Sequence, residues 1–424
     1  MNKVCSECNL EYNGYRCHST HFKNNCQKWT SGNDAIDKFI QEAQLTTDNS
    51  IRVIEWIPYD KLQNVELIAK GGYGTIYYAM WVEGAINNWD NENQRWKKYG
   101  QLEVVLKKFD GIVDINEVFL NEMKILLRMR QKISSTTFYG ITKDPGTREF
   151  MMVLQYFEGG SLRNHLNRNF DNIDWNDKLY FLKRLADEFL EIHNLDIIHR
   201  DFHPGNILKN NLKENYIHVT DFGLSKLITE NIKDLQEETI SGVLPYIAPE
   251  VLIGKEFTKA ADVYSFAFVA YEIIIGIPPY HDVPHDKDLA FKICNGFRPK
   301  IPFHIPKLIT QIIMRCWDAR ITHRPTFDEL YNELNKYYWD YENNNNDDKE
   351  ITIQIKKAEE EFSKNQATST TPANYKTHPQ AFYTSRLLNF SNLPTPKNRE
   401  NFEKELKELT ASFYRINASD DDDE

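Results

Sequence analysis

The sequence contains few cysteines and no long apolar run. It has six cysteines in 424 residues, and in a reducing compartment we expect these to be thiols or metal ligands instead of a disulfide framework. No stretch approaches the roughly 18–20 uninterrupted apolar residues of a membrane-spanning helix, and the first residues lack the apolar core of a secretory signal. These absences predict a soluble protein without a membrane partner, located in the cytoplasm, with the nucleus as the alternative.

The sequence also lacks an excess of positive charge. Its 51 lysines and arginines face 62 aspartates and glutamates, giving a formal net charge of −11. Such a balance disfavours non-specific binding to nucleic acid, and we expect no nucleic-acid partner. Hydrophobic residues make up 41% of the chain and aromatic residues 13%, which are values typical of a globular core.

Composition divides the chain into four parts. Residues 1–30 hold four of the six cysteines and form a possible small Cys/His segment, and residues 31–60 are a polar linker. Residues 61–338 show strand-like runs first and long helical runs later, which predicts one two-lobed domain. Residues 339–424 are polar and end in an acidic run, so we expect a mostly disordered acidic tail.

The first segment offers soft metal ligands. They are Cys5, Cys8, Cys17, His18, His21 and Cys26. Four of them would suffice for one tetrahedral Zn²⁺, although only the first cysteine pair has a standard spacing. A zinc knuckle and an unstructured segment with free thiols both stay open.

A glycine-containing turn lies between two β-prone runs. The segment reads Ile68-Ala69-Lys70-Gly71-Gly72-Tyr73-Gly74-Thr75-Ile76. Glycines let backbone N–H groups approach a phosphate without interference from a Cβ atom. An ordinary hairpin is the alternative, because Ala69 stands where a G-x-G-x-x-G pattern has its first glycine.

A lysine and a glutamate follow in elements of different type. Lys107 ends a strand-like run after a polar insertion at residues 83–101, which we expect to be a surface loop. Glu122 lies on the apolar stripe of a helix predicted over residues 115–130. A carboxylate there is costly to bury unless it is paired, and Lys107 is an available partner. The alternatives are an exposed lysine and a glutamate at the edge of the stripe.

Two polar segments carry the strongest signal. His199-Arg200-Asp201 is followed by Asn206, and Asp221-Phe222-Gly223 comes twenty positions after Asp201, at the end of a strand-like run. A carboxylate and an amide can share a hard cation such as Mg²⁺, which prefers oxygen ligands. Either segment alone could be an ordinary loop, but both at this spacing indicate a catalytic site.

The ordered set of motifs resembles the eukaryotic protein kinases over about 280 residues. The set comprises Gly71 and Gly74, Lys107, Glu122, His199-Arg200-Asp201 with Asn206, Asp221-Phe222-Gly223 and Ala248-Pro249-Glu250. The resemblance implies an α+β, bilobal protein-kinase fold, with a small, mainly antiparallel β N-lobe, a larger, mainly helical C-lobe, and ATP and Mg²⁺ between them.

The resemblance also implies a role for each matching residue. The turn at residues 68–76 would cover the ATP phosphates, and Lys107, held by Glu122, would contact the α- and β-phosphates. Asn206 and Asp221 would hold Mg²⁺, while Asp201 would accept the proton of the substrate hydroxyl. The adenine would lie against Gln155, Tyr156 and Phe157, with Leu154 behind it. Asp262 would be a buried strut beneath the catalytic loop, and Arg324 would pair with Glu250.

The class of acceptor residue is predicted from the positions at which this sequence differs from the usual kinase motifs. His203 and Val243 replace residues usual in serine/threonine kinases, but the loop sequences of tyrosine kinases are missing too. Leu244-Pro245-Tyr246-Ile247 looks like the tyrosine-kinase-like group, and the chain resembles a large set of such kinases in mycorrhizal fungi, which share a similar tail at residues 383–388. We expect phosphate transfer to protein hydroxyl groups in signalling, with serine and threonine favoured over tyrosine. The alternatives are a nucleotide-binding pseudokinase acting as a scaffold and a zinc-dependent interaction protein.

Regulation would involve the segment between Asp221 and Glu250. A phosphate on one of its hydroxyls could pair with Arg200 and order the segment. Thr239 and Ser241 are the candidates, with Ser225 and Thr229 nearby, and an upstream activating kinase is a possible partner. Solvated hydroxyls without a regulatory role are the alternative.

Overall fold

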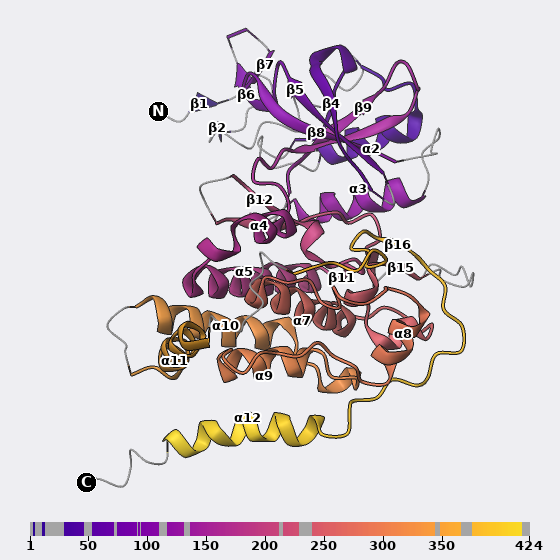
Figure 1. The fold of residues 1–424 in the computed structure, drawn as a ribbon. Helices are drawn as coiled ribbons and strands as arrows, with labels where there is room; N and C mark the ends of the chain where they lie inside the picture. Colours follow the sequence, from indigo (N-terminus) through magenta and orange to yellow (C-terminus); the bar gives the residue numbers. More distant parts are fainter. Residues whose placement is uncertain are drawn as a thin grey trace. The chain divides into compact units, whose positions relative to one another are not determined.

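The computed structural model describes residues 3–4, 11–12, 29–45, 53–71, 74–90, 92–93, 95–109, 117–130, 136–211, 215–228, 240–343, 348–365 and 375–417 (Figure 1). The chain divides into two compact units, Met1–Phe157 and Glu158–Glu424. Each unit is described by itself below.

The first unit is built around a six-stranded sheet. Its strands are β3 (Glu55–Trp56), β4 (Leu62–Lys70), β5 (Thr75–Trp81), β8 (Leu102–Lys108), β9 (Phe138–Lys143) and β10 (Phe150–Gln155). They are ordered β3-β9-β10-β8-β5-β4; only the β3–β9 pair is parallel. Alternate residues of the central strands, such as Ala79, Val104, Leu106 and Val153, form a buried core, as the two-residue period of a strand requires.

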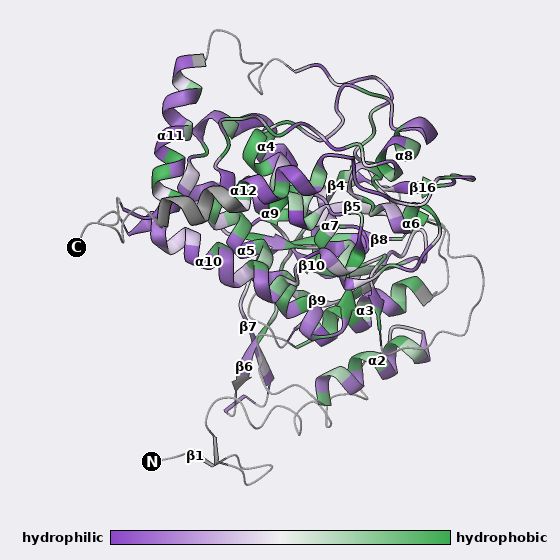
Figure 2. Cartoon of the chain, turned by 90° about the horizontal axis from the view of Figure 1, so that it is seen from below, coloured by the Kyte–Doolittle hydropathy of each residue, from purple (hydrophilic) through white to green (hydrophobic). Residues whose placement is uncertain are grey.

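The described residues of this unit include the α-helices α2 (Asp34–Leu45) and α3 (Glu117–Met129). The predicted linker at residues 31–60 is therefore corrected, because it contains α2. Asn33 caps this helix by accepting hydrogen bonds from the N–H groups of Ala35 and Ile36. Figure 2 shows hydrophilic and hydrophobic residues along α2, and Ile36 and Ile40 are fully buried. The polar composition hid this helical period.

The predicted surface loop at residues 83–101 is also corrected. It contains a hairpin of β6 (Ile86–Asp90) and β7 (Arg95–Lys98). Asp90 stabilises the turn because its side chain accepts hydrogen bonds from the N–H groups of Glu92 and Asn93. Ile86 packs with Val53 in a small cluster that Trp96 also contacts. Few apolar residues are involved, so the strand pattern was weak in the sequence.

The second unit is mainly helical. Its helices are α4 (Leu162–Asn169), α5 (Trp175–Asn194), α6 (Pro249–Leu252), α7 (Lys259–Ile275), α8 (Lys287–Cys294), α9 (Lys307–Cys316), α10 (Phe327–Glu342), α11 (Glu350–Asn365) and α12 (Phe402–Asn417). The predicted apolar face of α5 is confirmed, since Leu182, Leu185, Phe189 and Ile192 are all buried. Helix α7 is buried almost throughout, which explains its continuous apolar sequence.

Short strand pairs complete the described part of the chain. They are β1 (Lys3–Val4) with β2 (Glu11–Tyr12), β11 (Ile197–Ile198) with β14 (Lys226–Leu227), β12 (Ile207–Lys209) with β13 (Ile217–Val219), and β15 (Ile240–Gly242) with β16 (Arg386–Leu388). All four pairs are antiparallel.

The mostly disordered tail predicted after residue 338 is corrected by α11, β16 and α12. Helix α11 is tied to α10 by a hydrogen bond from Thr352 to the Asp340 carbonyl group, and α12 is tied to α9 by one from Gln311 to Thr410. Buried Ile351 and Ile355 lie one helical turn apart on α11. Their spacing supplies the apolar face that the average composition concealed.

The α+β class and the order of the two lobes are confirmed. The first unit is a mainly antiparallel sheet with helices, and the second is mainly helical. None of the helices in the described part of the chain has both the length and the apolar character needed to span a bilayer.

Candidate active site

The glycine-containing turn joins β4 to β5. The Gly71 N–H donates to the Gly74 carbonyl oxygen at 2.8 Å, and Ala69 and Lys70 pair with Ile76 and Thr75. A Cβ atom at position 74 would clash with the Lys108 carbonyl oxygen, so this glycine is needed for close approach to β8. Of the predicted phosphate-binding residues, Ile68, Ala69, Lys70 and Gly71 are exposed, whereas Thr75 is buried; Gly72 and Tyr73 lie outside the described residues.

Lys107 and Glu122 form a buried ion pair within the first unit. The Lys107 Nζ atom donates to the Oε1 and Oε2 atoms of Glu122 at 2.7 and 2.8 Å. The two side chains come from β8 and α3, and only 5% and 1% of the two residues is exposed. The sequence identified this partnership from the cost of burying a carboxylate. The pair holds the ammonium group in a fixed position.

The predicted adenine-binding segment lies at the end of β10. Leu154 is buried and pairs with Val105 of β8. The Gln155 side chain accepts a hydrogen bond from the Thr137 hydroxyl group at 3.1 Å, so it is held within its own unit. Tyr156 packs edge-on against Tyr78, and Phe157 is buried.

The loop containing Asp201 is held from below by Asp262 at the start of α7. Asp262 accepts hydrogen bonds from the N–H groups of His199 and Arg200 at 2.9 and 3.1 Å and contacts His193 Nε2 at 3.0 Å. Arg200 has a φ of 70°, a left-handed conformation that a non-glycine residue adopts at a cost. The predicted strut is confirmed, and it stabilises this strained loop.

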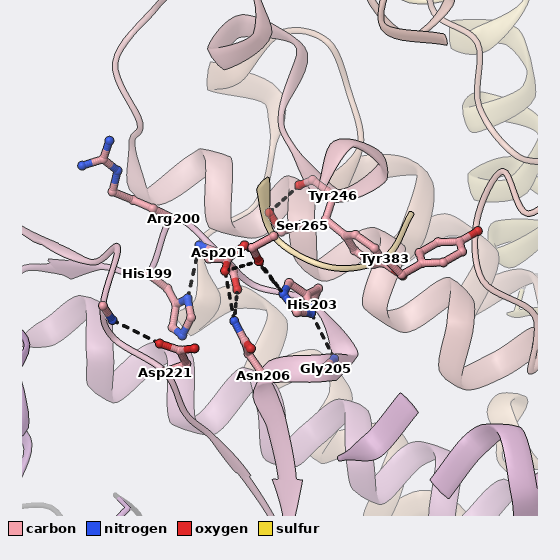
Figure 3. Close-up of polar contacts among 12 residues, drawn as sticks. His199, Arg200, Asp201, His203, Gly205, Asn206, Asp221, Tyr246, Ser265 and Tyr383 are labelled. Atoms are coloured by element: carbon pink, nitrogen blue, oxygen red, sulfur yellow. Dashed lines mark hydrogen bonds and ion pairs between the residues drawn. The ribbon is translucent and has the colours of Figure 1, made fainter. Parts of the chain in front are cut away.

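Polar side chains of the same loop lie next to Asp201. Asn206 donates to the Asp201 carbonyl oxygen at 3.0 Å and to Oδ2 at 3.2 Å, and Figure 3 shows both residues and His203 turned toward one another. The Oδ1 atom of Asp201 is buried and has no hydrogen-bond partner among the described residues. Buried carboxylate oxygens normally accept at least one hydrogen bond, so Oδ1 can accept one from a ligand.

His203, which replaces a lysine usual in serine/threonine kinases, shapes this loop. Its Nδ1 atom accepts a hydrogen bond from the Gly205 N–H at 3.0 Å, so in the neutral ring the proton is on Nε2. The Nε2 atom lies 3.7 Å from Asp201 Oδ1. His203 is therefore a hydrogen-bond donor beside the carboxylate.

Asp221 follows β13 and has an unusual backbone. Its φ is 63°, in the left-handed region, and its side chain accepts a hydrogen bond from the Gly223 N–H at 3.4 Å. The side chain is exposed while Phe222 beside it is buried. The buried Phe222 ring thus anchors the segment, and the Asp221 carboxylate lies at the surface.

The donor set of the second unit fits a hard cation. The Asn206 amide nitrogen faces Asp201, so the amide oxygen is the atom of this side chain that can bind a cation. Asp221 supplies a carboxylate. These are the oxygen ligands that Mg²⁺ prefers. The predicted zinc ligands Cys5, Cys8, Cys17, His21 and Cys26 lie outside the described residues, and within those residues no group of three His, Cys, Asp or Glu side chains could hold a metal ion.

Comparison with known proteins decides the family. A family model described as protein tyrosine and serine/threonine kinase matches residues 62–334, the span that contains the turn, the ion pair and both polar segments. The chain belongs to the protein tyrosine and serine/threonine kinase family. ATP and Mg²⁺ are typical of this kinase family.

Relatives of both acceptor classes resemble this kinase domain. The serine/threonine-protein kinase VIK of Arabidopsis thaliana is 30% identical over 280 residues, covering 64% of this chain and 59% of the relative. The tyrosine-protein kinase SPK-1 of Girardia tigrina is 26% identical, with coverages of 67% and 55%. The stress-activated protein kinase alpha of Dictyostelium discoideum is 28% identical, with coverages of 65% and 41%. The match thus spans about half of these relatives.

The kinase domain also contains the predicted Glu250–Arg324 pair. The Arg324 guanidinium donates to both Glu250 oxygens at 2.6 and 2.7 Å. Of the candidate regulatory hydroxyls, Ser225 is buried and donates to the His199 carbonyl oxygen, and Ser241 lies in β15. Thr229 and Thr239 lie outside the described residues.

Sequence reasoning missed one residue beside the kinase's catalytic loop. The Ser385 hydroxyl group donates to Asp201 Oδ2 at 2.6 Å, although 184 positions separate the two residues. The sequence offered two signals: a short run of aromatic, hydroxyl, arginine and leucine residues at 382–388 within the polar tail, and the likeness of residues 383–388 to a tail in other kinases. The polar surroundings of this run led us to expect disorder.

Proposed function

We propose that this chain is an active ATP-dependent protein kinase that phosphorylates hydroxyl groups of other proteins, with serine and threonine favoured over tyrosine. The observation that carries the proposal is the Asp201 carboxylate, which is buried, held by Asn206 and left with an unsatisfied Oδ1 atom. A substrate hydroxyl group is a donor that such an oxygen can accept.

The proposed mechanism assigns one task to each group. Asp201 orients the acceptor hydroxyl and takes its proton, while Asn206 fixes the carboxylate. The Lys107 ammonium, positioned by Glu122, neutralises charge on the α- and β-phosphates of ATP. Asn206 and Asp221 would hold Mg²⁺, which supplies further neutralisation of the phosphate charge when it is bound. Catalysis then rests on positioning and charge.

Two observations favour activity over the pseudokinase alternative. The residues predicted for the chemistry are present, and the described ones have chemically consistent partners: Lys107 with Glu122, and Asp201 with Asn206. The acceptor class rests on the departures from tyrosine-kinase loop sequences, because the relatives include both classes. Protein substrates and an upstream activating kinase are the proposed partners.

Phosphate transfer to casein from Mg·ATP by the purified chain tests the proposal. Asp201→Asn keeps the side-chain shape but removes the base, so we expect the rate to fall by about 10²–10⁴-fold. Asp171→Asn, at an exposed position, is the matched control and should retain the rate. Phosphoserine and phosphothreonine in the product would support the favoured acceptor class. A chain that binds ATP but transfers no phosphate to casein or to itself would support the scaffold alternative.

A further inference from the structure

The C-terminal segment at residues 375–388 lies on the catalytic loop of its own chain. Strand β16 pairs antiparallel with β15, so that Ile240, Ser241 and Gly242 face Leu388, Leu387 and Arg386. Figure 1 shows β16 beside β15 in the second unit. Strand pairing of this kind is a common way to bind an extended peptide, because main-chain hydrogen bonds set its register.

Side-chain contacts hold the segment on the N-terminal side of β16. The Tyr383 carbonyl oxygen accepts a hydrogen bond from Arg163 Nη1 at 2.9 Å, and the Tyr383 hydroxyl group donates to the Pro279 carbonyl oxygen at 2.8 Å. The Arg163 guanidinium also lies 4.9 Å from the centre of the Tyr383 ring. Arg163 is itself fixed by an ion pair with Glu272.

Further contacts extend along both sides of Tyr383. The His285 N–H donates to the Gln380 carbonyl oxygen at 2.9 Å, and the Arg386 guanidinium donates to the His285 carbonyl oxygen. The Tyr375 hydroxyl group donates to Asn167 at 3.2 Å. The segment is therefore bound by specific polar contacts at several points, which fixes the positions of the two residues between Tyr383 and Arg386.

These contacts place Ser385 against the proposed catalytic base, Asp201. Its hydroxyl group donates to Asp201 Oδ2 at 2.6 Å, and its Oγ atom accepts from His203 Nε2 at 3.2 Å. A serine oxygen has two lone pairs. With its proton directed to Asp201 and one lone pair on His203, the second lone pair is available for bonding. This is the arrangement that a nucleophilic hydroxyl needs.

The neighbouring hydroxyl group provides a contrast. Thr384 is exposed, whereas Ser385 is half-buried, because successive side chains of an extended chain point to opposite sides. Of these two hydroxyl groups, the segment thus presents only that of Ser385 to Asp201. The register of β16 determines which of the two it is.

We propose that Ser385 is a phosphorylation site of this chain itself, modified while residues 375–388 lie on the catalytic loop as a resident substrate. The proposal rests on the protein kinase activity proposed above. The Ser385 oxygen bonds to the γ-phosphorus of ATP as the bond from that phosphorus to the β,γ-bridging oxygen breaks. The hydroxyl proton passes to Asp201, and ADP leaves with the bonding electron pair.

The phosphorylated segment should bind the catalytic loop less well than the unmodified segment. A phosphoserine carries a charge of about −1.5 to −2, which would lie beside the Asp201 carboxylate. Repulsion between these groups disfavours the bound segment, so phosphorylation releases it. The edge of β15 and the Asp201 carboxylate then become accessible to other protein substrates.

The test uses the full-length chain, treated with phosphatase and then supplied with Mg·ATP and casein. Phosphopeptide mapping should find phosphate on Ser385, with a first-order rate constant that stays the same over a tenfold range of protein concentration. Ser385→Ala should lose this phosphopeptide, and Thr384→Ala should retain it. An added Asp201→Asn chain with an intact tail should stay unlabelled at Ser385, because the transfer is intramolecular.

A second variant tests the anchoring contacts without removing the acceptor. Tyr383→Ala removes the contacts to Pro279 and Arg163, and we expect Ser385 phosphorylation to slow by roughly tenfold, as for the loss of about 1.4 kcal/mol of binding. Phosphorylation of casein with Ser385 unmodified would overturn this inference and leave the proposed function intact. A Ser385 rate constant that rises with protein concentration would also overturn it. No transfer to either acceptor would overturn both proposals.

Discussion

Glu122 holds the Lys107 ammonium group with both carboxylate oxygens, at 2.7 and 2.8 Å. Both side chains are buried, and each charge lies within hydrogen-bond distance of the other. Removing one partner of a buried ion pair typically costs roughly 3–5 kcal/mol, whereas replacing both with apolar residues is often neutral. Stability and catalysis can therefore be separated at this pair.

We predict that Lys107→Met lowers the free energy of unfolding by roughly 3–5 kcal/mol and abolishes phosphate transfer. The double variant Lys107→Met/Glu122→Leu should recover most of the stability but none of the activity. Urea unfolding and casein phosphorylation measure the two effects. A double variant as unstable as the single one would contradict this account of the pair.

Asp262 accepts main-chain hydrogen bonds that shape the catalytic loop. Asp262→Asn removes the charge and replaces one acceptor oxygen with a donor. Hydrogen bonds to charged groups are worth about 1.5–3 kcal/mol each, so we expect a loss of at least that size in urea unfolding and a lower turnover rate with casein. Asp288→Asn, at an exposed position of α8, should change stability by less than about 0.5 kcal/mol. Equal effects of the two substitutions would refute the role of Asp262.

His199 is fully buried, and this burial lowers the pKa of its imidazole below the ordinary value, against the opposing effects of Asp262 and Asp201. Its Nδ1 atom accepts a hydrogen bond from the Asp201 N–H, which protonation would break. The unfolded chain binds a proton near pH 6.5, so it holds more protons than the folded chain just below that pH. The contribution of His199 to the free energy of unfolding is therefore fully present above about pH 6.5 and is lost as the pH drops below that value.

Comparison with His199→Gln isolates this effect. Between pH 7 and pH 5 the free energy of unfolding should fall further in the wild-type chain than in the variant, because other buried groups titrate alike in both. Urea unfolding at several pH values measures the two slopes. Parallel pH profiles would show that His199 contributes nothing to the acid sensitivity.

Helix α10 begins with a capping box formed by Thr326 and Glu329. Glu329 N–H donates to the Thr326 hydroxyl oxygen at 3.3 Å, and the Glu329 carboxylate accepts from the Thr326 N–H at 2.7 Å. Thr326→Ala should cost about 1 kcal/mol in thermal or urea unfolding. Thr326→Ser keeps the oxygen and should cost much less. The site matters because Phe327 next to it stacks on Phe189 of α5.

The parts of the fold that were predictable from sequence have strong local patterns. The apolar stripe around Glu122 predicted α3 and a buried carboxylate, and the structure has both. The helix at residues 34–45, the hairpin at residues 86–98 and the ordered tail were missed, because their apolar residues are few and are separated by polar ones. Their stability comes from contacts such as that of Gln44 with the Ile54 carbonyl oxygen, which composition does not reveal.

The sequence by itself determined the kinase family and the residues to which we assign its chemistry, because catalysis requires particular side chains in a fixed order along the chain. Only the tertiary structure decided what lies next to Asp201. Contacts of Arg163 with Tyr383 and pairing of β15 with β16 bring Ser385 to the carboxylate across 184 positions. Packing of both regions onto one helical core sets this proximity, and sequence spacing carries no information about it.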